Sequence, residues 1–148
     1  MSNSELLGGG SRDSLVGGNL VLNGHGTSKS STVNSVSLGV EAGRFNQDVS
    51  GIAIGAFAGA SGQQAGAIAI GANCAILNQG VSSIALGQRC TDVSNNCIVM
   101  NATGLDMSGN AFASGCYIKP VRTVARTGLR MLCYNPSTGE ITFDTVNQ

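Results

Sequence analysis

Residues 51–55 read Gly-Ile-Ala-Ile-Gly, and near copies follow at 67–71 (Ala-Ile-Ala-Ile-Gly) and 83–87 (Ser-Ile-Ala-Leu-Gly). Related pentapeptides stand at 35–39, 19–23 and 97–101, and 111–115 fits as a further copy. The closing Gly or Asn residues are 16 apart from Asn23 to Gly87, and Asn101 follows after 14. Self-similarity at a short fixed period indicates a repeat fold, in which each copy builds one unit of the structure.

Each copy has the pattern of a short strand that ends in a turn. Apolar, small and apolar residues alternate with period two, so that Ile52 and Ile54 point to one side and Ala53 to the other. Gly and Asn, which close the copies, are the residues that most readily take positive φ. We therefore expect one coil of a parallel β-solenoid per repeat. The larger apolar residues are expected to carry its core: Ile52, Ile54, Ile68, Ile70, Ile84 and Leu86.

Two further positions recur at fixed distances from each turn. A small residue stands three residues after it, where a tight coil needs an inward-facing side chain. These residues are Gly26, Ala42, Ala58, Cys74, Cys90 and Gly104. A second apolar position follows ten residues after the turn. It holds Val33, Val49, Ala65, Val81 and, after the last long turn, Ala111. Both series support a coil.

The fold that we expect is all-β: a parallel β-roll or solenoid of 14–16-residue repeats, homotrimeric, with a C-terminal β-hairpin cap. Such a thin coil keeps an apolar outer sheet surface, and a trimer would bury it and remove exposed edges. Residues 135–139, Asn-Pro-Ser-Thr-Gly, form a turn between two alternating strands, which predicts the hairpin. Three segments follow: a flexible lead-in at 1–18, the repeat domain at 19–118 and the cap segment at 119–148.

The composition argues against several function classes. The net charge is zero and only 11 % of the residues are charged, so there is no overall field for nucleic acid or an acidic membrane. No apolar run reaches the roughly 18 residues of a membrane span, and residues 1–10 lack a secretion-signal pattern. His25 is the sole histidine and the acids are scattered, so we expect no catalytic, cofactor-binding or metal-binding residues and no enzyme.

The five cysteines favour a reducing compartment. Their number is odd and no CxxC pair occurs, which argues against a disulfide framework. Cys74 and Cys90 fall at the small inward position of consecutive coils, where free cysteine acts as a small buried hydrophobe.

Half of the basic residues lie in one segment that contains no acid: Lys119, Arg122, Arg126 and Arg130. In a trimer they would form a positive band that contacts an acidic glycan or another polyanion. The alternative is a solvated surface, or pairing with Glu140 and Asp144 across the hairpin.

The repeats resemble the head repeats of trimeric autotransporter adhesins, whose signature is a run of the kind Ser-x-Ala-Ile-Gly-x-x-Ala; the similar stretches here are 51–58, 67–74 and 83–90. The resemblance covers about residues 20–115 and implies a left-handed parallel β-roll that trimerises. The segments 115–122 and 132–143 look instead like the ends of virus and phage fibre and tail proteins. This implies a structural virion fibre protein, assembled in the host cytoplasm and displayed on the virion surface for attachment to a host glycan or receptor.

Two alternatives stay open. One is the head of a bacterial trimeric adhesin at the bacterial cell surface. The other is a left-handed β-helix acyltransferase, since residues 70–76 resemble one of its hexapeptides. That enzyme fold needs a six-residue period, whereas the spacings here, 16 and 14, are not multiples of six.

Overall fold

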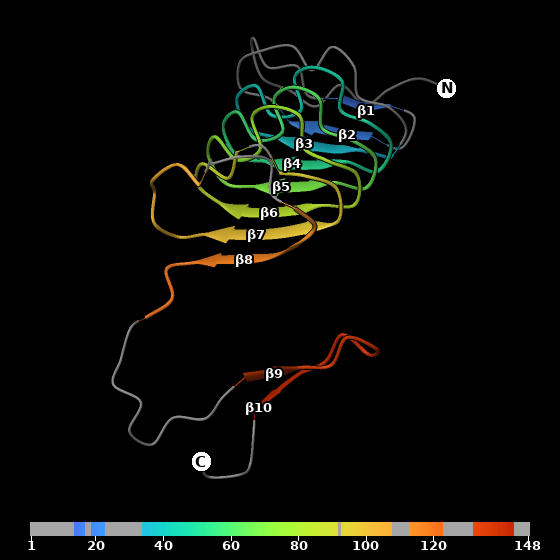
Figure 1. The fold of residues 1–148 in the computed structure, drawn as a ribbon. Coiled ribbons are helices and arrows are strands. Elements are labelled where there is room, and N and C mark those ends of the chain that lie inside the picture. Colours follow the sequence, from blue (N-terminus) through green and yellow to red (C-terminus); the bar gives the residue numbers. More distant parts are fainter. Residues whose placement is uncertain are drawn as a thin grey trace.

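The computed structural model describes residues 14–16, 19–22, 34–91, 93–107, 113–122 and 132–143. Its strands form an eight-stranded sheet in sequence order and a separate two-stranded sheet (Figure 1). The strands of the large sheet are β1 (Ser14–Val16), β2 (Asn19–Leu22), β3 (Val36–Leu38), β4 (Ile52–Ile54), β5 (Ile68–Ile70), β6 (Ile84–Gly87), β7 (Cys97–Asn101) and β8 (Gly115–Lys119). The small sheet consists of β9 (Leu132–Tyr134) and β10 (Ile141–Phe143).

The repeats stack as a parallel β-solenoid, as the spacing predicts. From β2 to β8 every neighbouring pair is parallel, and equivalent residues of successive repeats are in register, as in Ile52↔Ile68↔Ile84. On another side of the coil, the bridges Phe45↔Ser61↔Leu77 advance by the same repeat. Strand β1, within the segment that the sequence predicts as the lead-in, pairs antiparallel with β2 and extends the sheet.

The core lies on the opposite face of the strands from the one that we expect from the sequence. Ala53, Ala69 and Ala85 are fully buried, whereas Ile70 keeps 38 % of its surface exposed. The other five expected core residues are only partly buried. The reason is the width of the coil: from β3 to β6 the interior at this strand position holds only the small side chains of Ser37, Ala53, Ala69 and Ala85, so the larger alternate residues point outward.

The expectation for the small residues after the turn is confirmed where the structure describes them. Ala42, Ala58, Cys74 and Cys90 are all fully buried. The second apolar position is not inward: Val49 and Val81 are about four-tenths exposed.

Three glutamines face the interior of the coil, where the residues of the second apolar position do not. Gln47, Gln63 and Gln79 are fully buried and stand at the same position of successive repeats. Each amide Nε2 donates to backbone carbonyls, for example from Gln63 to Ile52 at 2.7 Å and to Ala67 at 3.1 Å. This ladder satisfies backbone carbonyls inside the coil, where an unpaired group would be costly. In the next coil the buried Val93 takes the position of the glutamines, so the ladder ends there.

The closing glycines have the conformation that their position predicts. Gly39, Gly55, Gly71 and Gly87 have φ between 106° and 129°. A Cβ on Gly55 would lie 2.8 Å from the carbonyl carbon of Gly71 in the next coil. These residues therefore allow both the sharp corner and the close stacking of coils.

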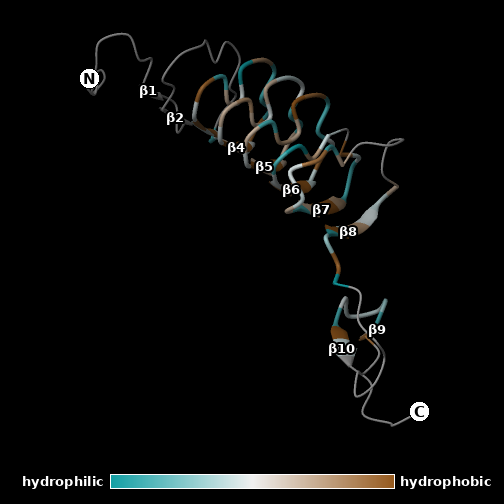
Figure 2. Ribbon diagram, turned by 90° about the vertical axis from the view of Figure 1, so that its left-hand side faces the viewer, coloured by the Kyte–Doolittle hydropathy of each residue, from teal (hydrophilic) through white to brown (hydrophobic). Residues whose placement is uncertain are grey.

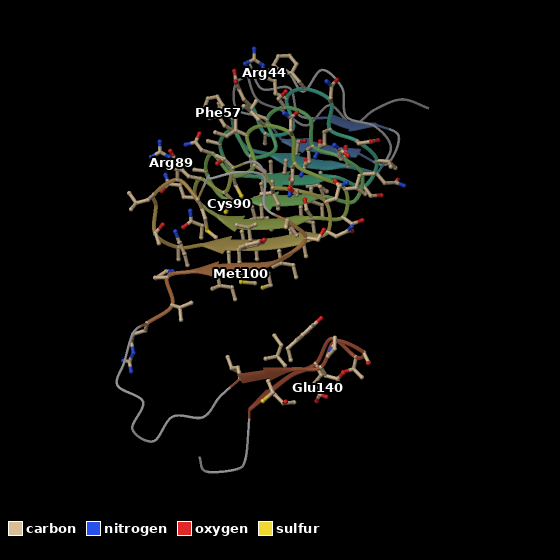
Figure 3. The ribbon with its side chains drawn as sticks, in the orientation of Figure 1. Arg44, Phe57, Arg89, Cys90, Met100 and Glu140 are labelled. Carbon is tan, nitrogen blue, oxygen red and sulfur yellow. The ribbon has the colours of Figure 1, made fainter. Side chains whose placement is uncertain are left out.

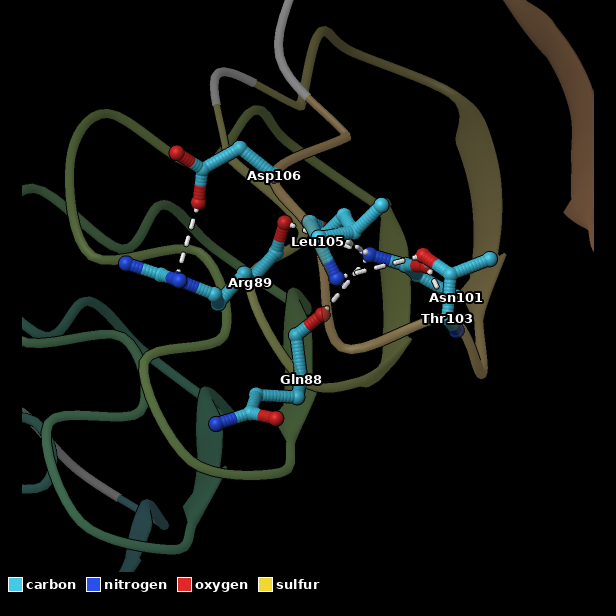
Figure 4. A network of polar contacts seen from close by, with 6 residues as sticks. All are labelled: Gln88, Arg89, Asn101, Thr103, Leu105 and Asp106. Carbon is cyan, nitrogen blue, oxygen red and sulfur yellow. Dashed lines mark hydrogen bonds and ion pairs between the residues drawn. The ribbon is translucent and has the colours of Figure 1, made fainter.

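The coil that contains β7 closes differently, because Asn101 replaces glycine. Its Nδ2 donates to the carbonyls of Gln88 and Leu105, both at 2.8 Å, and its Oδ1 accepts from the hydroxyl of Thr103 at 2.6 Å (Figure 4). Arg89 and Asp106 add an exposed ion pair at 2.9 Å beside this network. One buried amide thus anchors the long turn that follows β7.

The C-terminal hairpin is confirmed, but it covers no described part of the solenoid. β9 and β10 pair antiparallel, and Gly139 N–H donates to the carbonyl of Asn135 across the expected turn. Residues 132–142 are all exposed. The expected function of the hairpin as a cap on the open edge of β8 is therefore not seen among residues 113–122 and 132–143, which the structure describes.

Candidate self-association surface

The outer face of the large sheet carries two ladders of apolar side chains. They come from the strand positions that alternate with the buried small residues, and the in-register pairing aligns them along the rod. One ladder is Val36, Ile52, Ile68, Ile84, Ile98 and Cys116, and the other is Leu38, Ile54, Ile70, Leu86, Met100 and Ile118. Figure 2 shows hydrophobic residues along β6 and β7.

These ladders form a continuous apolar strip that water reaches. The exposed members occur along the whole strip: Leu38 is 42 %, Met100 is 39 % and Ile118 is 51 % exposed. No charged residue interrupts either ladder from β3 to β8. Lys119 follows Ile118, the last residue of the second ladder. Large apolar patches on a protein surface mark sites of association.

Some exposed apolar residues outside this strip lie beside charged side chains and are less suited to a dry contact. Arg44, Phe57 and Arg89 lie along one corner of the coils (Figure 3). The guanidinium of Arg44 lies 4.5 Å from the ring centroid of Phe45 and also pairs with Glu41 at 2.7 Å. This corner is a mixed surface of the kind that faces solvent.

The structure describes only half of the predicted basic band. Lys119 ends β8 and Arg122 follows it, and both are exposed. Arg126 and Arg130 lie outside the described residues. Contact with an acidic glycan therefore stays a prediction.

The cysteines fall into two groups. Cys74, Cys90 and Cys97 are fully buried, and Cys116 and Cys133 are exposed. The hydrogen bond with Cys90 is the largest influence on the Cys74 thiol, and together with burial it raises the pKa of that thiol. The same hydrogen bond lowers the pKa of the Cys90 thiol. The sequence predicts the burial of this pair, but not that each thiol shifts the pKa of the other.

Within the described ranges, no three His, Cys, Asp or Glu side chains gather into a group that could hold a metal ion. Over the same residues, the structure contains no helix with the length and hydrophobicity needed to cross a membrane.

Comparison with known proteins identifies no relative of this chain. No protein-family model matches the chain, and no match is found among curated proteins or solved structures. The fold and the surface therefore rest on the chain's own residues.

Proposed function

We propose that this chain is a structural, non-enzymatic component of a virion fibre or tail, which assembles as a homotrimer and serves display or host attachment. The observation that carries the proposal is the apolar outer face of β3–β8, which a single chain leaves in water.

Self-association accounts for this face better than solvation does. Fully burying a side chain of the size of Ile or Leu is worth about 1.5–3 kcal/mol. These side chains are already partly buried in the single chain, so contact between copies contributes the remaining part, from two side chains in each coil. Since equivalent residues repeat along the rod, a second copy meets the same apolar strip along its whole length. Neither ladder carries a charge that would oppose contact between copies.

Three copies around one axis are proposed from the resemblance of the repeats to trimeric adhesin heads. A rotation that closes on itself buries the face in every subunit and leaves none for open-ended growth. The proposed left-handedness of the β-roll comes from the same resemblance.

The location on a virion comes from the resemblance of segments 115–122 and 132–143 to the ends of virus and phage fibre proteins. The hairpin in the second segment supports this proposal, because its exposed residues are available for contact with another component. A host glycan or receptor is the proposed ligand.

Electron microscopy of the purified full chain, combined with a titration of acetyl-coenzyme A, tests this function. We expect class averages of short rods with threefold symmetry and no saturable binding of the coenzyme. Class averages that show single, unassociated chains would contradict assembly. Saturable, stoichiometric binding of acetyl-coenzyme A would contradict a purely structural role and would favour an acyltransferase.

A further inference from the structure

Two buried cysteines occupy the same position on neighbouring coils. Cys74 and Cys90 stand one repeat apart, and both are fully buried. The backbone holds them in step, because Gly59 N–H donates to the carbonyl of Cys74 and Ala75 N–H donates to that of Cys90. Adjacent strands lie about 4.8 Å apart. That separation is inside the range of roughly 4.4–6.8 Å between the Cα atoms of a disulfide.

The two thiols contact different backbone carbonyls, and their acidities differ. Cys74 Sγ lies 3.3 Å from the carbonyl oxygen of Ala85, and Cys90 Sγ lies 3.3 Å from that of Leu86. The hydrogen bond between the two thiols raises the pKa of Cys74 and lowers the pKa of Cys90. Cys90 is therefore the thiol that loses its proton first, and the thiolate is the reactive form.

We propose that Cys74 and Cys90 form a redox-modification site, in which a peroxide converts the stacked thiols into a disulfide that links two neighbouring coils. The Cys90 thiolate attacks one oxygen of hydrogen peroxide, which yields a sulfenic acid and hydroxide. The Cys74 sulfur then attacks the Cys90 sulfur, and the sulfenic oxygen leaves as water with the proton of the Cys74 thiol. In sum, two thiols and one peroxide give one disulfide and two waters.

Cys97 is an internal control for the reaction of Cys74 with Cys90. It is equally buried, but the equivalent residues on the neighbouring coils are not cysteines. The register places it in line with Gly115 on the next coil, and its Sγ contacts the carbonyl of Ala113 at 3.1 Å. The residue one repeat earlier, at its position in the coil, is Ser83. Burial alone therefore does not predict which cysteines react together, whereas the stacking of coils does.

This site goes beyond the proposed function and does not depend on it. A disulfide across one repeat closes a loop in the unfolded chain and so favours the folded state. A protein made with reduced thiols would thereby gain a covalent link between coils when it meets an oxidising environment. Because both thiols lie inside the coil, the oxidant reaches them only when the coil opens locally, so we expect a slower reaction than at Cys116.

The test uses the full chain with Cys116→Ser and Cys133→Ser, so that exposed thiols cannot link different molecules. The folded protein is treated with hydrogen peroxide, denatured in an alkylating agent and cut with trypsin, which cleaves after Arg89 and separates the two cysteines. Mass spectrometry is expected to find the Cys74 and Cys90 peptides joined, with fragmentation between Thr91 and Cys97 assigning the bond to Cys90. Cys97 should be alkylated.

Two outcomes would overturn the proposal: Cys74 and Cys90 stay fully alkylatable after the peroxide treatment, or they oxidise separately at the same rate as Cys97. The variant Cys74→Ser gives a second readout, because Cys90 then lacks its partner and its sulfenic acid should be trapped by dimedone in higher yield than in the parent. If that variant fails to fold, the melting temperature of the parent decides. The oxidised form should melt higher than the same sample after reduction, and equal melting temperatures would contradict a link between coils.

Discussion

Gly55 and Gly66 both take a positive φ, yet a side chain should destabilise the fold at Gly55 and have little effect at Gly66. Gly55 has φ 119°, and a Cβ there would meet the backbone of Gly71. Gly66 has φ 64° and only the hydroxyl of Ser82 near it, at 3.9 Å. Asn34, at the position of Gly66 two coils earlier, has the same φ of 64°.

We predict that Gly55→Ala lowers the free energy of unfolding by about 1–3 kcal/mol from backbone strain alone, and that the clash with the next coil adds to this loss. Gly66→Asn should change it by less than about 0.5 kcal/mol, because asparagine tolerates this conformation. Urea denaturation followed by circular dichroism measures both. Equal effects would show that the corner at Gly55 is not constrained by the next coil.

The glutamine ladder makes a second prediction at the scale of the residue. Ser37 Oγ donates to Gln47 Oε1 at 2.6 Å, but in the next coil Ala53 takes the place of the serine, and Gln63 Oε1 has no hydrogen-bond partner among the described residues. Ala53→Ser should supply the missing donor. We expect a gain of about 1 kcal/mol in the free energy of unfolding.

Ala69→Ser, one coil further, is the matched control. Gly43 leaves room for the Ser37 hydroxyl, since a Cβ there would collide with it, and Gly59 leaves the same room beside residue 53. Ala75 stands at that position beside residue 69, so its methyl group should clash with the new hydroxyl. Denaturant midpoints should move up for Ala53→Ser and down for Ala69→Ser. A loss in both would contradict the geometry of the ladder.

At the scale of the element, strand β5 separates the inside of the coil from its outside. Ala69 is fully buried and Ile70 is 38 % exposed. Ala69→Asp should unfold the chain, because an unpaired buried charge costs several kcal/mol. Ile70→Asp should keep the β circular-dichroism signal and lose the assembled mass in light scattering. If Ile70→Asp unfolds the chain as completely as Ala69→Asp, Ile70 belongs to the core and the face assignment is wrong.

The elements differ in how well the sequence predicts them. The constant spacing of the pentapeptides predicts the strands and their parallel register, because only a stacked coil brings the same pattern back at a fixed interval. Alternation alone gives two faces and does not say which one is enclosed. The usual preference for burying isoleucine suggests the wrong face here, because the side chains of Ala53, Ala69 and Ala85 face the interior and the isoleucines beside them point outward.

Two other features of the elements show where the sequence pattern succeeds and where it fails. The hairpin follows from residues 135–139, whose local turn chemistry needs no tertiary context. The buried glutamines are not predicted, because a polar residue outside a strand is ordinarily assigned to an exposed loop. Their own regular spacing, from Gln47 to Gln63 to Gln79, is the signal that could find them.

At the scale of the whole molecule, Cys116 reports on the proposed contact between copies. It lies on the outer face of β8, in register with Ile98, and it is exposed in the single chain. Three copies packed through this face would bring their Cys116 thiols together. In a Cys133→Ser variant we expect a short bis-maleimide linker to produce covalently joined chains on a denaturing gel.

The variant Cys116→Ser, with Cys133 kept, is the comparison for the cross-link. It should give less product, since Cys133 lies on the hairpin and outside the proposed interface. Equal yields from both variants, or no product from the first, would place the contact elsewhere.

The mass of the purified full chain in solution, measured by light scattering on a size-exclusion column, tests the homotrimer most directly. The account predicts about three times the 14.9 kDa of one chain, unchanged on dilution. A folded species at the mass of a single chain, with its β signal intact, would contradict it.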